Sequence, residues 1–420
     1  MILPRTVVLG ALAVAMTVAA LVGFEAADAQ STPSDAVAQG RYLVTLGDCR
    51  GCHTNTADKP FAGAKPLETP FGVIYTSNLT PDKATGIGSW SSDQFYRALH
   101  EGIRADGAHL YPAFPYPYFT HVSRADSDAI YSYLRTVGPV TQVVPPNKFP
   151  FPLNIRSLVA VWNALYFDEG DFKYNPAKSP EWNRGAYLVT GLGHCGGCHT
   201  PKNWLAADEN EHALAGAALN HWFAADLTGD MRAGLAGWSA AEIVEYLKNG
   251  RNAHATASGA MKEVIVLSTS QTSDDDLRAI ATYLKEEPPA GAVPVAATPD
   301  AVAMRAGGAI FRDQCAACHG ADGAGILRMF PPLPRNASVQ SNDPTTVVRI
   351  ILEGSRSPST SAMPTPLTMP SFAWKLTDQQ IADVTSYIRN SWGNQAPPVS
   401  ESDVRNLRTA IGATKAVNGK

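Results

Sequence analysis

All six cysteines of this chain lie in C-x-x-C-H pentapeptides, and this arrangement of residue types could do chemistry. The three copies are CRGCH at 49–53, CGGCH at 195–199 and CAACH at 315–319. Two thiols followed directly by an imidazole could form a disulfide, bind a zinc ion or carry a covalently attached haem. The rest of the chain discriminates among these three.

The pattern favours haem over the other two groups. A disulfide framework has no use for a histidine after every second cysteine. A structural zinc site needs a second closely spaced Cys/His pair, whereas these motifs stand far apart in the chain. A redox-active cysteine pair does not require the histidine and does not usually occur three times. C-x-x-C-H is the attachment sequence of c-type haem, so three covalently bound haem c groups are predicted.

The attachment chemistry assigns a role to each residue of the motifs. The cysteines would bond covalently to the porphyrin, and the adjacent histidines would be the proximal ligands of iron. The predicted thioether residues are Cys49, Cys52, Cys195, Cys198, Cys315 and Cys318. The predicted proximal ligands are His53, His199 and His319.

The surroundings of the motifs also repeat three times. An apolar segment with an aromatic residue (Tyr42, Tyr187 or Phe311) precedes each motif, and an amphipathic helix with a tyrosine (Tyr133, Tyr283 or Tyr387) ends each repeat. The closing helices begin at Ser, Thr or Asp residues suited to N-caps. Internal repetition indicates tandem domains. The predicted fold is therefore all-α, with three tandem domains like those of class I cytochromes c.

The register of the repeats gives the domain boundaries. The cytochrome c domains are predicted at 35–140, 180–288 and 301–393. Residues 141–179 are too apolar for a free linker and are expected to pack against a domain or a partner subunit. Residues 289–300 form a Pro/Ala linker, and 394–420 form a C-terminal tail.

The N-terminus has the features of an export signal. One arginine, an apolar run over 7–24 and the small residues Ala27 and Ala29 predict a signal peptide over 1–29. The apolar run is long enough that an uncleaved membrane anchor is the alternative. Either form places the protein on the periplasmic side of the inner membrane. The net charge of -4 argues against a nucleic-acid partner.

A thioether sixth ligand would suit the haems to electron transfer, so a methionine ligand is expected in each domain. In domain three, Met369 is preferred to Met363 because it stands at a suitable distance before the last helix. In domain two, Met261 is preferred to Met231 for the same reason. Met261 and Met369 are the predicted distal ligands.

Domain one contains no methionine, and Phe114 occupies the place where a ligand is expected. Phenylalanine cannot coordinate iron. His109, in the same loop, is the first alternative, followed by His121 and His100. An open sixth position on this haem is the other alternative.

Taken together, these motifs resemble the triheme cytochrome c subunits of bacterial membrane-associated alcohol, gluconate, fructose and aldehyde dehydrogenases. The resemblance covers about residues 35–395 and includes GRYLVTLGDCRGCHT, RGAYLVTGLGHCGGCHTPKN and MPSFAWKLTDQQIADVTSYIRNSWGN. Members that serve quinoprotein or flavin-dependent dehydrogenases usually have methionine where Phe114 stands, whereas relatives encoded beside molybdenum hydroxylases often look like LYPAFPY. The resemblance therefore implies a molybdenum hydroxylase as catalytic partner, with flavin and quinoprotein partners as alternatives, and allows for a small iron–sulfur subunit.

The expected function is that of an electron-transfer subunit without a substrate-transforming site of its own. It would take electrons from a dehydrogenase catalytic subunit and deliver them to membrane quinone or a terminal oxidase. Two rival hypotheses are a haem enzyme that acts on peroxide or another small ligand at the first haem, and a free-standing periplasmic electron carrier.

Overall fold

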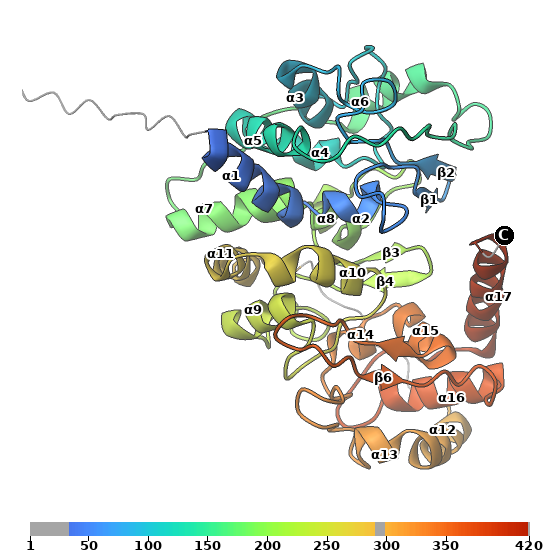
Figure 1. Ribbon diagram of the computed structural model, residues 1–420. Coiled ribbons are helices and arrows are strands. Elements are labelled where there is room, and N and C mark those ends of the chain that lie inside the picture. The colour runs from blue at the N-terminus through green and yellow to red at the C-terminus, as the bar shows by residue number, and fades with distance from the viewer. Residues whose placement is uncertain (1–32, 290–298, 419–420) are drawn as a thin grey trace, which may run out of the picture.

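The computed structural model describes residues 33–289 and 299–418 (Figure 1). The predicted signal peptide, 1–29, lies outside these residues, as does most of the predicted linker. Residues 35–140, 180–288 and 301–393 are called units 1, 2 and 3 below. In Figure 1 the three units follow one another down the long axis of the molecule in chain order. Within the described residues, no helix combines the length and the apolar character needed to cross a membrane.

Helices dominate all three units. Unit 1 has α1 (Pro33–Leu46), α2 (Cys49–His53), α3 (Ser92–His100), α4 (Tyr116–Phe119) and α5 (Arg124–Leu134). The connecting segment has α6 (Val159–Tyr166), after a 3₁₀ turn at Arg156–Leu158. Unit 2 has α7 (Pro180–Tyr187), a π-helical turn (Leu188–Leu192), α8 (Gly196–His199), α9 (Ala240–Asn249), α10 (Gly259–Leu267) and α11 (Asp274–Lys285). Unit 3 has α12 (Ala301–Gln314), α13 (Ala316–His319), α14 (Ala337–Gln340), α15 (Thr345–Glu353) and α16 (Asp378–Arg389).

The prediction of an all-α chain is incomplete, because the structure adds three short antiparallel sheets. They are formed by β1 (Pro66–Thr69) with β2 (Gly72–Tyr75), β3 (Ala217–Leu219) with β4 (Trp222–Ala224), and β5 (Ser355–Arg356) with β6 (Thr368–Met369). The first two sheets are hairpins at equivalent places in units 1 and 2. Strands of two to four residues leave almost no alternating pattern in a sequence, which is why they were missed.

In each unit the first helix crosses the last at a glycine. A Cβ atom added to that glycine would lie only about 2 Å from a carbonyl oxygen of the opposite helix, so only glycine allows the two backbones to come this close. The glycines are Gly40, Gly185 and Gly307, and they face the carbonyls of Ala129, Ala279 and Asp383, respectively. The tyrosine predicted in each closing helix packs at the same crossing. The three units thus share one way of crossing their terminal helices.

Units 1 and 2 exchange equivalent contacts. Tyr42 of α1 donates a hydrogen bond to Asp276 (2.6 Å) in the first turn of α11, and Tyr187 of α7 donates one to Asp126 (2.6 Å) in the first turn of α5. Each hydroxyl also accepts from the backbone N–H of the serine that caps the partner helix, at 3.3 and 3.2 Å. Tyr42 and Tyr187 stand at the same position of their units, so the pairing is pseudo-twofold.

The hydrophobic core reflects this pairing. Buried side chains of units 1 and 2, such as Leu43, Ile130, Leu188 and Leu284, belong to a single cluster. Unit 3 has its own cluster around Phe311. The molecule therefore consists of a joined pair of units followed by a third unit with a separate core.

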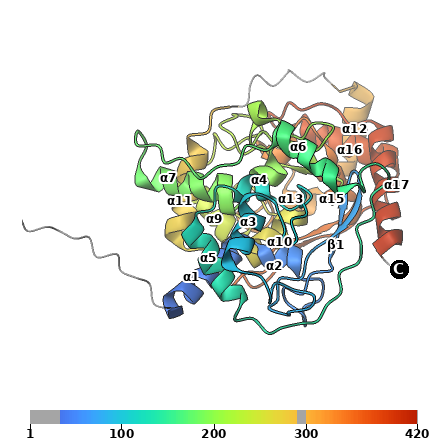
Figure 2. The same cartoon turned by 90° about the horizontal axis from the view of Figure 1, so that it is seen from above.

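The C-terminal tail closes the core of unit 3. It forms α17 (Glu401–Asn418), which lies at the right edge of Figure 2 and was not expected from the sequence. Val404 and Ile411 of this helix are buried in the core of unit 3. The fully buried Arg389 of α16 donates to the carbonyls of Val339, Ser341 and Pro397, and so ties the start of the tail to the unit. Buried carbonyls need such partners.

The connecting segment, 141–179, is held on one side and open on the other. Asn163 accepts a hydrogen bond from Tyr116, and Trp162 donates to the carbonyl of Leu205 (3.0 Å). Phe151 and Leu165 nevertheless remain 80% and 65% exposed. The segment thus leaves apolar side chains on the surface.

Candidate haem sites

Each C-x-x-C-H motif forms a short helix directly after the first long helix or π-helical turn of its unit. The motifs occupy α2, the turn into α8, and the turn into α13. Side chains three and four positions apart lie on the same face of a helical turn. The fold therefore presents two thiols and one imidazole together in each unit, as covalent attachment of a porphyrin requires.

A backbone carbonyl orients each motif histidine. The Nδ1 atoms of His53, His199 and His319 lie 2.7, 2.6 and 3.2 Å from the carbonyl oxygens of Ser77, Ala225 and Pro331, respectively. A carbonyl can only accept, so Nδ1 carries the proton and the lone pair of Nε2 is left for a metal. This hydrogen bond is the usual outer contact of a metal-binding histidine.

The hairpins of units 1 and 2 explain where two of these carbonyls come from. Ser77 follows β2 closely, and Ala225 follows β4 directly. The repeated stretches SNLT and ADLT begin at these two residues. The sequence repeat was visible, but its role in fixing a histidine was not predicted.

Burial shifts the pKa of several motif side chains toward the neutral form. It lowers the pKa of His53, His199 and His319, so that their imidazoles are unprotonated and can coordinate a metal at neutral pH. It also raises the pKa of Cys49 and Cys195 to about 12, so both remain thiols.

The cysteines fit haem better than zinc or a disulfide. Zinc binds thiolates, and within 33–289 and 299–418 no three Cys, His, Asp or Glu side chains are grouped to hold a metal ion. All six cysteines are free. Two unpaired thiols beside an oriented histidine in each unit fit covalently attached haem c.

The methionines predicted as distal ligands lie in different local structures. Met261 is in the first turn of α10 and is half-buried, whereas its rival Met231 is 84% exposed. Met369 is in β6 and packs against the core of unit 3. The rival Met363 instead accepts a hydrogen bond from Arg251 of unit 2. Met231 is thus largely exposed to solvent, and the sulfur of Met363 is hydrogen-bonded to Arg251.

The histidines considered for unit 1 differ in the partners of their ring nitrogens. His121 donates through Nδ1 to the carbonyl of Thr190 (2.9 Å), which leaves its Nε2 lone pair available, as in the motif histidines. His100 lies 3.3 Å from Asp171 and stacks on Tyr96. His109 has a buried Nδ1 without a hydrogen-bond partner among the described residues. Phe114, in the expected ligand position, packs against Phe119 in an edge-to-face arrangement.

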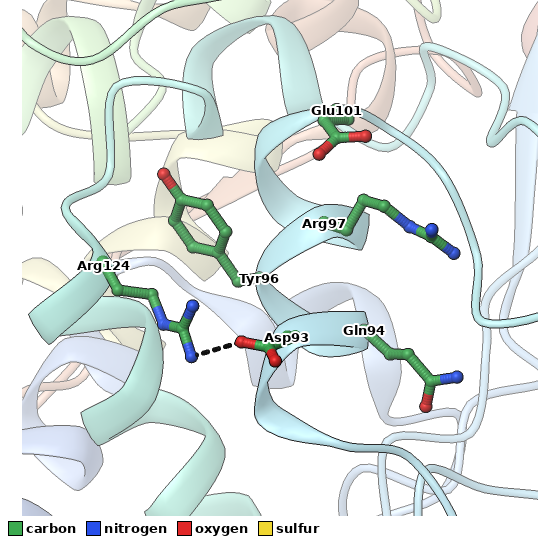
Figure 3. A pocket seen from close by; sticks show the side chains of 6 residues that line it. All are labelled: Asp93, Gln94, Tyr96, Arg97, Glu101 and Arg124. Carbon is green, nitrogen blue, oxygen red and sulfur yellow. Dashed lines mark ion pairs between the residues drawn. The ribbon is translucent and has the colours of Figure 1, made fainter.

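A cavity of about 260 Å³ lies elsewhere in unit 1, between α3 and the start of α5 (Figure 3). Its lining is mainly charged and includes an ion pair between Arg124 and Asp93 (2.7 Å). The lining residues are Asp93, Gln94, Tyr96, Arg97, Glu101 and Arg124. None of them belongs to a haem-attachment motif or was predicted as a ligand, so this cavity is not part of the candidate haem sites.

Comparison with known proteins agrees with this chemistry. Residues 304–392 match the cytochrome c family. The chain is 40% identical to the gluconate 2-dehydrogenase cytochrome c subunit of Pantoea cypripedii, over 91% of this chain and 92% of that protein. It is 39% identical to the cytochrome c subunit of alcohol dehydrogenase (quinone) from Gluconobacter oxydans (strain 621H), over 92% and 85% of the two chains.

A third relative also serves a dehydrogenase. The chain is 36% identical to the fructose dehydrogenase cytochrome subunit of Gluconobacter japonicus, over 90% of this chain and 85% of that protein.

The attachment turns, the oriented histidines and the helical fold define a c-type cytochrome. Similarity over nearly the whole chain shows which c-type cytochromes it is related to. The chain belongs to the family of cytochrome c subunits of dehydrogenase complexes. Such subunits transfer electrons and work with a dehydrogenase catalytic partner.

Proposed function

We propose that this chain is a triheme electron-transfer subunit, with one haem c attached in each unit. It carries electrons from the catalytic subunit of a dehydrogenase to membrane quinone or a terminal oxidase. The observation that carries the proposal is the threefold occurrence of one local geometry, two thiols and a histidine whose Nδ1 is engaged by a carbonyl. Haem iron supplies the one-electron redox chemistry, and the chain supplies attachment, orientation and burial.

The proposed distal ligands are Met261 in unit 2, Met369 in unit 3 and His109 in unit 1. The exposure of Met231 and the contact of Met363 with Arg251 support the two methionines. The unpartnered Nδ1 of His109 supports the histidine. A histidine in place of methionine would lower the potential of the first haem relative to the other two.

The partner proposed first is a molybdenum hydroxylase, because the loop around Phe114 looks like that of cytochromes encoded beside such enzymes. Flavin and quinoprotein dehydrogenases are the alternatives, and a small iron–sulfur subunit is a further candidate partner. The N-terminal sequence supports export, so the complex is placed on the periplasmic side of the inner membrane.

The direct test is purification of the native complex with the full chain. We expect three haems per chain by pyridine haemochrome assay and mass spectrometry, and molybdenum in the accompanying large subunit. Fewer than three haems would refute the triheme assignment, and flavin without molybdenum would refute the choice of partner. A chain recovered alone would favour a free-standing carrier, and rapid cyanide or peroxide binding would favour a haem enzyme.

A further inference from the structure

A lysine holds the attachment turn of unit 1 and is itself held by unit 2. Lys65 Nζ donates to the carbonyl of Gly51, between the two cysteines, at 2.6 Å. The same Nζ forms an ion pair of 3.0 Å with Glu263. Glu263 lies on α10 of unit 2, which packs against α2. The first attachment turn is therefore fixed by a side chain from the other unit.

The attachment turn of unit 2 is likewise held by a lysine of its own unit and by a side chain from unit 1. Lys202 Nζ donates to the carbonyl of Gly196 (2.9 Å) and pairs with Asp208. Tyr118 of unit 1 donates its hydroxyl hydrogen to the same carboxylate. The ring of Tyr118 lies so close to Gly196 that a Cβ atom there would be 2.9 Å from the ring carbon Cε1. A larger side chain at this position would therefore displace a residue from unit 1.

The two turns also face each other. Leu192, just before the second motif, packs within about 3 Å of the position of a Cβ on Gly47, just before the first. Both views place α2 beside α10 (Figures 1 and 2). The attachment edges of the first two haem sites therefore lie at the boundary between the units.

We propose that Glu263 and Tyr118 are positioning residues that act across this boundary, each on the attachment turn of the other unit, and make the first two haem sites a coupled redox pair. The proposal rests on the assignment of one haem to each of these turns. Unit 3 is outside the pair, because its contacts with unit 2 lie elsewhere, as in the ion pair between Arg328 and Glu245 (2.5 Å).

The charges predict the sign of the effect. Glu263 neutralises Lys65, so its loss leaves an unpaired positive charge beside the first attachment turn. A nearby positive charge favours the reduced, less positive state of a redox centre, and the midpoint potential of the first haem should rise. Since the Glu263 side chain is 50% exposed, the shift should shrink at high ionic strength.

The test uses the full chain in its native complex and measures the potential of each haem by redox titration followed by electron paramagnetic resonance. Signals are assigned with variants in which one pair of attachment cysteines is replaced by alanine. Glu263→Gln should raise the potential of the first haem and leave the third unchanged, and Glu263→Asp should restore the original value. Glu245→Gln, which breaks an ion pair between units 2 and 3, is the matched control and should leave the first two potentials unchanged.

Tyr118 is tested by two further variants. Tyr118→Phe keeps the ring and should shift only the potential of the second haem, whereas Tyr118→Ala should also reduce attachment of that haem. If Glu263→Gln shifts only the haem of its own unit, or shifts none while all three haems are bound, the proposal is overturned. If the unmodified chain lacks haem at either turn, the proposed function fails instead, and the haem assay separates the two outcomes.

Discussion

Replacing Tyr42 with phenylalanine should destabilise the joined pair of units 1 and 2 and leave unit 3 unaffected. The change removes one hydroxyl, which donates at 2.6 Å to Asp276. Asp276 is only 8% exposed, so water cannot readily replace the lost donor. Hydrogen bonds to charged groups contribute more than neutral ones, and we expect a loss of about 2 kcal/mol. Tyr187→Phe should cost about 1 kcal/mol, because Asp126 is more exposed and can be hydrated.

The assay is native-state hydrogen exchange of the haem-loaded protein, read by mass spectrometry from peptides of α1, α7 and α12. Peptides from α1 and α7 should show equal losses of opening free energy in Tyr42→Phe, because units 1 and 2 share one core. Peptides from α12 should not change. Tyr174→Phe, at a 57% exposed tyrosine, is the control. A loss confined to α1, or one shared by α12, would refute the coupling of the first two units.

The effect of Tyr42→Phe should depend on pH. Burial alone would raise the pKa of Asp276, but hydrogen bonds from Arg184 and Tyr42 and the charge of Arg184 outweigh burial and lower it. A carboxyl whose pKa is lowered by folding stabilises the native state above its unfolded pKa, and this contribution is lost as pH falls through the folded pKa. The difference between the variant and the original protein should therefore shrink as pH falls below 3.8, the ordinary value for aspartate. If the stability difference between the variant and the original protein stays the same in acid, it does not arise from the hydrogen bond to ionised Asp276.

Further substitutions test the glycine packing, the buried arginine and the proposed iron ligands. Gly185→Ala places a methyl group 1.9 Å from a backbone carbonyl and should cost about 3 kcal/mol or more in urea unfolding. Gly138→Ala, with open space around it, should cost little, and equal losses would contradict the packing argument. Arg389→Met should leave buried carbonyls unpaired and lower the unfolding free energy of unit 3 by about 3 kcal/mol, whereas an unchanged urea midpoint would refute that role. Met369→Leu should abolish the methionine-to-iron absorbance of one haem, and His109→Ala should alter the spectrum of a different one; an unchanged spectrum would exclude the residue concerned as a ligand.

The sequence was most informative where short local patterns determine structure. The helix N-caps predicted from Ser, Thr and Asp residues are confirmed at Ser123, Ser273 and Thr377, each of which accepts a hydrogen bond from a backbone N–H in the first turn of its helix. The attachment motifs can also be recognised from the sequence, because their chemistry requires adjacent residues, and their cysteines and histidines stay predicted haem-binding residues. Caps and motifs depend on neighbours within a few positions, so a single sequence is sufficient to find them.

The sequence was less informative about the register of the repeats. An aromatic residue precedes each motif, at Tyr42, Tyr187 or Phe311, but the sequence alone does not align these three positions. The helix crossings align them, because Tyr42 and Tyr187 stand two residues after their crossing glycines, whereas Ala309 is the residue two after Gly307. The glycine that fixes the register is defined by a contact with a distant helix. That contact leaves no local pattern in the chain.

This difference at one position helps to explain why only two of the three units are joined. Pairing as seen in units 1 and 2 needs a tyrosine on the first helix and an aspartate in the first turn of the last helix. Unit 3 has Ala309 and Gln380 at these positions and lacks both partners. It closes its core with α17 instead. The association of repeated segments therefore depends on individual side chains that differ between the copies of the repeat.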